Sequence, residues 1–371
     1  MDLLNQKIRN CIPNDLVFSI MSKMSLKSLY RFKCVHKSCS LLLENSYFMN
    51  MYRKHFISDN SYYDDTCLLL KQTMLDNENH SLMYLFSSER FDNKVKLDWP
   101  PSFQEDGRDI NILGSGINGI LCLYVEGFNS KVVLWNPAIE EYKVIPFSPA
   151  FFVPPYVRVM NQIHGFGYDY IRDDYKVIQY VDFHTNMSKV SYDPLWEIYS
   201  LKSNSWRKLD LDTTTFYHCP IGVLEQVYMN GVCHWLGRDE TNIDNVYLVS
   251  FDLGNEVFFL TSILLTMDDN IDSDLVDTHL VILNESIALI SNDLKISIFH
   301  ISILGEIGVN ESWIKLFTVG PLSCIGRPIG VWKNGDIFFV KENEEDEELA
   351  KCDLITHTIQ ELGITIWELV R

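Results

Sequence analysis

The sequence lacks any long uninterrupted apolar run, although 47% of its 371 residues are hydrophobic. Because a transmembrane helix needs about 20 consecutive apolar residues, we expect no membrane span. No apolar stretch that could serve as a signal peptide precedes Asn10. The nine cysteines are scattered without a Cys-x-x-Cys pair, which argues against a zinc ribbon or a disulfide framework. A reducing compartment, cytoplasmic or nuclear, fits this cysteine usage best.

Basic residues are scarce. The chain has 31 Lys and Arg against 50 Asp and Glu, a net charge of −19. Such a surface repels phosphate backbones, so we expect no nucleic-acid partner. The charge is uneven, because residues 1–60 have nine basic and four acidic residues, a net of +5, which leaves −24 for the rest. The sequence therefore predicts two parts of opposite charge.

Residues 12–56 have the periodicity of short helices. Apolar residues recur every three to five positions, a spacing that forms one apolar stripe along a helix; they are Leu16, Ile20, Met24, Leu29, Phe32 and Val35. Pro13 suits a first helical turn and Ser25 an N-cap. We expect one helix after Pro13, a second over 26–35 and a third over about 37–43. About 40 residues is the lower limit for unaided folding, so three short helices cannot bury the whole apolar stripe themselves. We therefore expect part of this stripe to be covered by a partner protein.

From about Tyr62 the pattern changes to short β-rich runs separated by Gly, Asn, Asp and Pro. A unit of two apolar strands joined by a short turn recurs six times; its first strand ends near positions 87, 136, 200, 252, 300 and 353, at intervals of 49, 64, 52, 48 and 53 residues. Asn-Gly pairs, the strongest short hairpin signal, precede further strands at 118–119, 230–231 and 334–335. Six units of about 50 residues match the kelch-type period of four strands per propeller blade.

A propeller is stable only when its ring is closed. We therefore expect Ile364–Leu369 to add a strand to the blade that begins near residue 66. The longest interval, 64 residues, contains a Pro-rich excursion, Pro146–Pro155. The predicted fold is mostly β with a small α N-terminal module, in which three helices are followed by a kelch-like β-propeller of six blades.

Fixed spacings over Ile12–Phe48 form a second kind of pattern. It comprises Ile12-Pro13-Asn14-Asp15-Leu16, then Ile20 and Met24, then Leu26-Lys27-Ser28-Leu29-Tyr30-Arg31-Phe32-Lys33-Cys34-Val35 followed by Lys37-Ser38. In these residues the stretch resembles the F-box. Ser25 departs from the family pattern where Pro is usual, and Cys39 where Trp is usual. The loss of an indole removes contact area, which would lower affinity for the partner.

Short motifs also follow one another in order over residues 110–340. They are Gly114-Ser115, Asn118-Gly119, Leu134-Trp135-Asn136-Pro137, Gly165-Phe166-Gly167-Tyr168-Asp169, Asp173-Asp174-Tyr175-Lys176-Val177, Ser205-Trp206-Arg207, Asn230-Gly231-Val232-Cys233-His234-Trp235, Ser250-Phe251-Asp252-Leu253 and Glu311-Ser312-Trp313. In these motifs the region resembles the F-box-associated domain of large plant families, including relatives of S-locus F-box proteins. The resemblance implies an F-box at 8–56 and an F-box-associated, target-binding domain at 62–371.

Together the two resemblances imply a non-enzymatic substrate receptor of a Skp–cullin–F-box ubiquitin ligase, with an unidentified target protein. The resemblance implies that the F-box binds a Skp-type adaptor, which links it to a cullin. The residues expected to contact the adaptor are mainly Pro13, Leu16, Ile20, Leu26, Leu29, Phe32 and Val35. Some of these side chains must pack the helices together instead, and the spacing does not separate the two sets. We expect no cofactor, no metal and no membrane partner. The substrate-binding residues are not indicated.

Two motifs match the sequence patterns of nucleotide- and calcium-binding sites but lack the structural context that such sites require. Gly114-x-Gly116-x-x-Gly119 fits the dinucleotide fingerprint, but Ile120–Tyr124 indicates a strand where that fingerprint needs a helix, so we interpret it as a hairpin. Residues 268–274 resemble a calcium loop, but Ser273 and His279 stand where Gly and Glu are required. We interpret them as a solvated acidic loop.

Neither His164 nor His234 has a second His or Cys two to five positions further on, so packed side chains are the favoured interpretation. Tryptophans recur at equivalent places of the repeat (135, 206, 235 and 313), which favours blade cores over a sugar-stacking platform. Two alternatives stay open. One is a propeller enzyme or carbohydrate-binding protein with a helical appendage, and the other is a degenerate F-box that no longer joins a ligase.

Overall fold

The computed structural model describes residues 14–24, 28–29, 31–32, 37–43, 45–49, 51–52, 67–73, 81–86, 94–103, 109–125, 131–154, 156–185, 193–210, 226–238, 246–263, 276–293, 296–322, 325–332, 335–342, 347–366 and 369–370. The chain divides into two compact units, Met1–Ser61 and Tyr62–Arg371, which we call the head and the propeller. Within the described residues, no helix is long and apolar enough to cross a membrane.

The head contains α1 (Asn14–Met21) and α3 (Lys37–Leu43). Residues 28–29 and 31–32 are also helical and lie within the range expected for the second helix. Aromatic rings fill the interior of this unit. Phe18 of α1 meets Phe48 edge-on with 5.0 Å between ring centroids, and Phe48 lies 6.2 Å from Tyr52. Offset and edge-on ring pairs of this kind stabilise a small core beyond the area that they bury.

One helical segment of the head was not predicted. Residues 46–49 and 51–52 are helical, and the Asn45 side chain accepts hydrogen bonds from the backbone N–H groups of Tyr47 (3.0 Å) and Phe48 (3.1 Å). This is an N-cap, which satisfies donors that the first helical turn leaves free. The Tyr52 hydroxyl donates to the Met24 carbonyl at 3.3 Å, which ties the segment to the residues that follow α1. Asn45, a preferred N-cap residue, is therefore the sequence signal for this segment.

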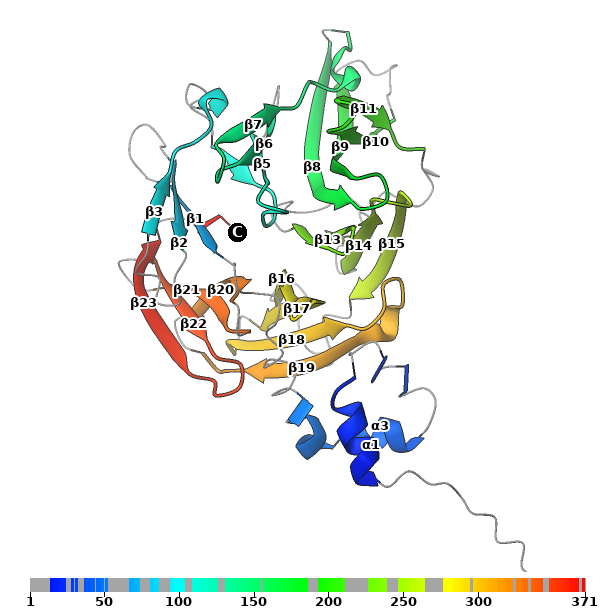
Figure 1. The fold of residues 1–371 in the computed structure, drawn as a ribbon, viewed down its shortest axis with the longest axis vertical. Coiled ribbons are helices and arrows are strands. Elements are labelled where there is room, and N and C mark those ends of the chain that lie inside the picture. Colours follow the sequence, from blue (N-terminus) through cyan, green and yellow to red (C-terminus); the bar gives the residue numbers. More distant parts are fainter. Residues whose placement is uncertain are drawn as a thin grey trace, which may run out of the picture. The chain divides into compact units, whose positions relative to one another are not determined.

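The propeller consists of six four-stranded antiparallel sheets arranged in a ring (Figure 1). Each sheet is one blade, and its strands run outward from the ring axis in the order given. The blades are β24 (Leu369–Val370), β1 (Leu68–Thr73), β2 (Ser81–Phe86) and β3 (Lys94–Leu97); β4 (Asn111–Ile112), β5 (Leu121–Tyr124), β6 (Val132–Asn136) and β7 (Glu141–Val144); β8 (Val157–Asp169), β9 (Asp174–Thr185), β10 (Leu195–Ser200) and β11 (Ser205–Lys208); β12 (Gln226–Met229), β13 (Val232–Arg238), β14 (Val246–Asp252) and β15 (Val257–Ile263); β16 (Val276–Leu283), β17 (Ser286–Asp293), β18 (Ile298–Leu304) and β19 (Trp313–Val319); and β20 (Ile325–Val331), β21 (Ile337–Glu342), β22 (Glu347–Cys352) and β23 (Ile359–Ile366).

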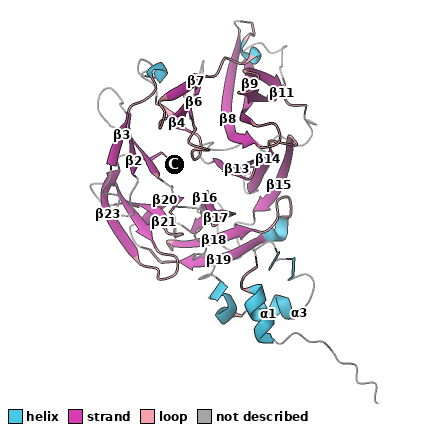
Figure 2. Cartoon of the chain, viewed as in Figure 1, coloured by secondary structure: helices cyan, strands magenta, loops and turns pink. Residues whose placement is uncertain are grey.

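The predicted fold class, mostly β with six blades after a small helical module, is confirmed (Figure 2). The repeat found in the sequence corresponds to the end of the third strand of a blade. Positions 136, 200 and 252 are the last residues of β6, β10 and β14, and position 353 directly follows β22. In the fifth blade the assignment was wrong by four residues, because β18 continues past His300 to Leu304. Position 87 lies outside the described residues.

The ring closes through the C-terminal segment. β24 pairs antiparallel with β1, with Val370 opposite Lys71 and Leu369 opposite Gln72. The predicted closure through Ile364–Leu369 is right in kind and wrong in its bounds. Ile364 belongs to β23, the outermost strand of the preceding blade. One blade therefore combines strands from both ends of the propeller, which makes its stability depend on the whole ring.

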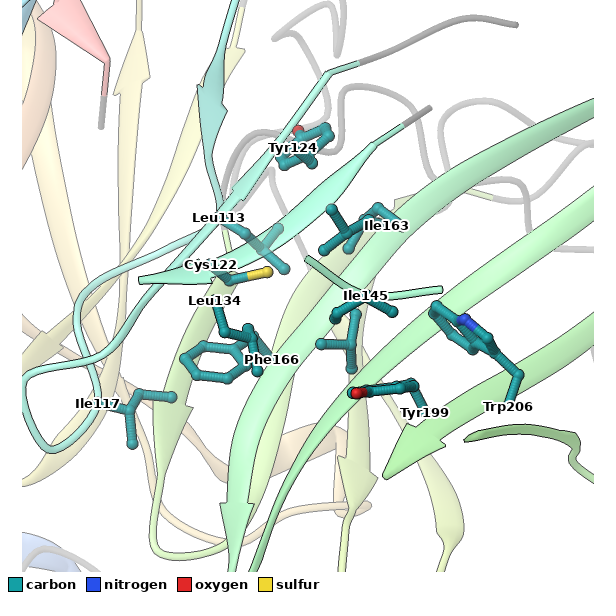
Figure 3. Close-up of a cluster of buried hydrophobic side chains, with 12 residues drawn as sticks. Leu113, Ile117, Cys122, Tyr124, Leu134, Ile145, Ile163, Phe166, Tyr199 and Trp206 are labelled. Carbon is teal, nitrogen blue, oxygen red and sulfur yellow. The ribbon is translucent and has the colours of Figure 1, made fainter. Parts of the chain in front are cut away.

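Apolar clusters fill the spaces between blades. Figure 3 shows the cluster between the second and third blades, which contains Leu113, Cys122, Leu134, Ile145, Ile163, Phe166, Tyr199 and Trp206. Trp135, Trp206 and Trp235 are buried and Trp313 is partly buried. Their positions in blade cores agree with the packing role expected from the repeat.

The antiparallel order of strands fixes what lies at each end of the ring. Turns from the first to the second strand of a blade, and from the third to the fourth, lie at one end, which we call the turn end. The Asn118-Gly119 and Asn230-Gly231 pairs form such turns, with φ of 50° and 79° in the first and 51° and 82° in the second. Connections between blades, such as that from β7 to β8, lie at the other end, which we call the connection end.

Candidate partner-binding surfaces

Two large apolar side chains of α1 are half exposed. Leu16 is 52% and Ile20 is 50% exposed. Because they are four residues apart in one helix, they lie on the same face, and we call them the α1 apolar pair. Phe32 is 40% exposed. Exposed apolar side chains that gather in one small unit indicate a surface for another protein.

The structure separates residues that the apolar spacing had grouped together. Leu29 is fully buried, so it packs the head interior and offers no contact to a partner. Leu16, Ile20 and Phe32 keep their candidacy as adaptor-binding residues. The remaining candidates, Pro13, Leu26 and Val35, lie outside the described residues, as do Ser25 and the side chain of Cys39.

Two further exposed residues of the head were not among the candidates. Leu41 of α3 is 55% exposed and Tyr47 is 72% exposed. The Tyr47 ring stacks on Phe18 with 5.6 Å between centroids, so only part of its surface is open. The run Leu41-Leu42-Leu43 held a signal for the first of these, because three consecutive helical residues cannot all face one side.

The two histidines singled out in the sequence are packed in the propeller. His164 is fully buried, with ring centroids 5.0 Å from Trp196 and 5.7 Å from Trp235, and burial lowers its pKa to about 3. Nδ1 of His234 lies 2.8 Å from the Ser250 hydroxyl, and burial lowers its pKa to about 3 as well. Both are therefore neutral near pH 7. Within the described residues, no three His, Cys, Asp or Glu side chains are grouped as metal ligands.

The glycine motif at 114–119 is part of a hairpin. Gly119 has φ of 79° and is followed by β5, so no helix N-terminus faces a phosphate. At Gly114 a Cβ atom would come within 2.5 Å of the Gln226 carbonyl oxygen, so this glycine serves close packing between blades. The acidic stretch 268–274 lies outside the described residues.

A buried ion-pair network joins the third and fourth blades at the turn end. The Lys176 ammonium lies 2.7 Å from Asp169 and 3.1 Å from Glu256, and Glu256 also pairs with Arg207. Burial alone would raise the pKa of Asp169, but hydrogen bonds from Lys176 and Arg172 outweigh it and hold that pKa below its usual value. Because every charge has a partner inside the network, we assign it to holding blades together.

The two units correspond to two known families. Residues 71–366 match the F-box associated beta propeller domain, and residues 10–50 match the F-box domain. The first match alone covers more than half of the chain.

Similar proteins come from Arabidopsis thaliana. F-box protein CPR1 is 23% identical over 321 residues, which is 83% of this chain and 73% of CPR1. F-box only protein 8 is 28% identical over 256 residues, 67% of this chain and 78% of that protein. A further F-box protein of the same plant is 27% identical over 179 residues, and there the match spans 46% of this chain and 41% of the relative.

Solved structures are more distant. TolB of Acinetobacter baumannii is 11% identical with a TM-score of 0.43, and the match covers 82% of this chain and 66% of TolB. A similarity of this size carries no argument about function.

The resemblances found in the sequence are thus confirmed. An F-box followed by an F-box-associated propeller supports a general role as a substrate adaptor in ubiquitination. The chain belongs to the F-box proteins that carry an F-box-associated β-propeller domain.

Proposed function

We propose that this protein is the substrate-recognition subunit of a Skp–cullin–F-box ubiquitin ligase, which recruits a target protein for ubiquitination and degradation. The observation that carries the proposal is the α1 apolar pair, Leu16 and Ile20, which stays half exposed although the core of the head is already filled by Leu29 and Phe48. Covering the pair with an apolar surface of a Skp-type adaptor would supply the driving force for assembly.

In this role the protein performs no bond-making step itself. The head fixes the chain to the adaptor and cullin, and the propeller holds the target. The target's lysines then meet a ubiquitin-conjugating enzyme at a high effective concentration. We propose the cytoplasm or nucleus as its location, supported by the buried free thiols Cys122, Cys233 and Cys352 in the part of the chain that the structure describes.

Charge supports the encounter with an acidic adaptor. Lys23 and Lys37 of the head are exposed, and residues 1–60 have a net charge of +5. Long-range attraction speeds association and weakens as salt rises, whereas buried apolar contacts set most of the affinity. We therefore expect the α1 apolar pair to matter more than the lysines.

The test is co-purification of a Skp-type adaptor and cullin with the full chain. Leu16→Asp combined with Ile20→Asp should lower adaptor binding by at least about 100-fold, because each lost apolar contact is worth about 1.5–3 kcal/mol. The charge-matched control is Val257→Asp with Phe259→Asp, which changes two side chains of β15 that are 45% and 40% exposed. The control should retain the adaptor.

Leu29→Asp separates contact from folding. Because Leu29 is fully buried, this variant should lose the helical signal of the head together with adaptor binding. The Leu16→Asp and Ile20→Asp variant should keep the helical signal. Full adaptor binding by that folded variant would reject the interface.

A further inference from the structure

The connection from β7 to β8 presents aromatic side chains to solvent. It contains the Pro-rich excursion of the sequence and the short 3-10 helix η2 (Pro149–Phe151). Phe147 is 55%, Phe152 is 85% and Tyr156 is 49% exposed. Val144, the last residue of β7, is 40% exposed next to them in sequence. We call Phe147, Phe152 and Tyr156 the aromatic connection.

Hydrogen bonds to three other strands hold this segment in place. The Ile145 N–H donates to the Val132 carbonyl of β6 at 2.9 Å. The Trp206 indole of β11 donates to the Pro146 carbonyl at 2.7 Å. The side chains of Ile145 and Trp206 both belong to the apolar cluster between the blades (Figure 3). With positions 145 and 146 fixed in this way, Phe147 is carried on an anchored backbone.

A buried polar row supplies the next anchor. The Ser148 hydroxyl accepts a hydrogen bond from the Ala150 N–H at 3.0 Å, which caps η2, and donates to the Glu197 carboxylate of β10. The same Glu197 oxygen accepts from Gln179 of β9 at 2.7 Å, and Gln179 accepts from Asn161 of β8 at 3.1 Å. All four side chains of the row are buried. A turn closed by the Phe152 N–H to the Pro149 carbonyl (3.0 Å) follows.

This geometry has an energetic consequence. A flexible loop loses conformational entropy when it binds, and a loop already held in one conformation does not. Burying Phe152 in a partner would therefore cost little backbone entropy, so more of its transfer free energy would contribute to binding. Exposed aromatic side chains on a backbone that is already held in place are the usual anchors of protein interfaces.

Charge indicates what the partner offers. From Tyr142 to Tyr168 the sequence contains two full positive charges, Lys143 and Arg158, and no carboxylate, within a chain of net charge −19. Lys143 lies on β7 and is exposed. The stretch begins directly after Glu141 of β7 and includes the exposed aromatic residues, and its sign is opposite to that of the propeller as a whole.

We propose that the aromatic connection is the surface on which the recruited protein docks, through an apolar segment flanked by Asp or Glu. The inference rests on the proposed function and adds the place and the chemistry of target recognition. The apolar part of the segment covers Phe147, Phe152 and Tyr156, and its carboxylates approach Lys143.

A second copy of this chain fits less well. In a symmetric dimer each surface meets itself, so Lys143 would face a positive surface. The strongly acidic propeller also opposes close approach of two copies. A short segment flanked by Asp or Glu brings carboxylates to Lys143 and far fewer negative charges to the propeller than a second copy would.

The test uses short random peptides displayed on phage and selected on the immobilised full chain. Selected peptides should combine aromatic or aliphatic residues with Asp or Glu. One selected peptide is then synthesised and titrated against variants by fluorescence anisotropy. Phe147→Ser with Phe152→Ser should weaken its binding about tenfold or more, and Lys143→Glu about threefold with a flatter salt dependence. The matched control, Val257→Ser with Phe259→Ser on β15, should bind the peptide as the unaltered chain does.

Several outcomes overturn the inference. They are selection of peptides rich in Lys or Arg, failure to select any peptide, and unchanged affinity in the Phe147→Ser and Phe152→Ser variant. If the unaltered chain sediments as a dimer and the Phe147→Ser and Phe152→Ser variant sediments as a monomer, the surface binds a second copy of the chain instead. Adaptor binding is measured in parallel. The Leu16→Asp and Ile20→Asp variant should lose adaptor binding and keep peptide binding. The two measurements therefore test the adaptor interface and the aromatic connection independently.

Discussion

Leu16 and Leu29 show what apolar spacing alone leaves undecided at the scale of single residues. Both lie in the same apolar pattern of the head, yet Leu16 is 52% exposed and Leu29 is fully buried. A helical period identifies the apolar face of a segment, but what covers that face depends on neighbours that are distant in sequence. In α1, for example, the neighbour of Phe18 is Phe48, which lies 30 positions further along the chain in a helical segment beyond the three expected.

The buried imidazole of His164 makes the stability of the propeller depend on pH. Its pKa is about 3 in the folded state and about 6.5 in an unfolded chain. Between these values the unfolded chain binds a proton that the folded chain does not, so stability falls as pH falls from about 6.5 towards 3. His164→Phe removes this contribution and keeps an aromatic ring against Trp196 and Trp235.

We expect the His164→Phe variant to gain about 1–2 kcal/mol relative to the unaltered chain when the pH is lowered from 7 to 5. Urea unfolding followed by tryptophan fluorescence at both pH values measures this. His184→Phe is the control, because that side chain is 56% exposed. Parallel pH dependence in the His164→Phe variant and the unaltered chain would show that the imidazole titrates normally.

At the scale of elements, turns and repeats were predictable because their causes are local. Asn-Gly pairs adopt positive φ at little cost, and the structure has turns at Asn118-Gly119 and Asn230-Gly231. The closing strand was harder, because pairing of β24 with β1 joins residues about 300 positions apart. Its bounds could not be derived from the alternation of a two-residue strand.

Deleting Leu369–Arg371 tests ring closure. The deletion removes the hydrogen bonds of β24 to Lys71 and Gln72 and leaves β1 as an open inner edge. We expect a loss of about 1–3 kcal/mol, seen as a lower and broader calorimetric transition. Removing Arg371 alone should change neither the midpoint temperature nor the width of the transition. An identical transition after the longer deletion would mean that β24 adds nothing to the ring.

At the scale of the whole molecule, the sequence predicted both units and six blades, because a period near 50 residues survives variation at single positions. It also marked Pro146–Pro155 as a departure from that period. It could not show that Ser148, Glu197 and Trp206 anchor the excursion, since these contacts link segments about 50–60 residues apart. Identifying the candidate site therefore required the tertiary structure, whereas the fold could be predicted from the repeat pattern of the sequence.

The central claim is that only the head binds the adaptor, while the propeller remains free to bind a target. Hydrogen–deuterium exchange of the full chain with and without a saturating plant Skp-type adaptor tests it most directly. We predict added protection in peptides covering residues 12–56, around Leu16 and Ile20, and unchanged exchange throughout 62–371. Protection spread over the propeller, or none in the head, would contradict the account.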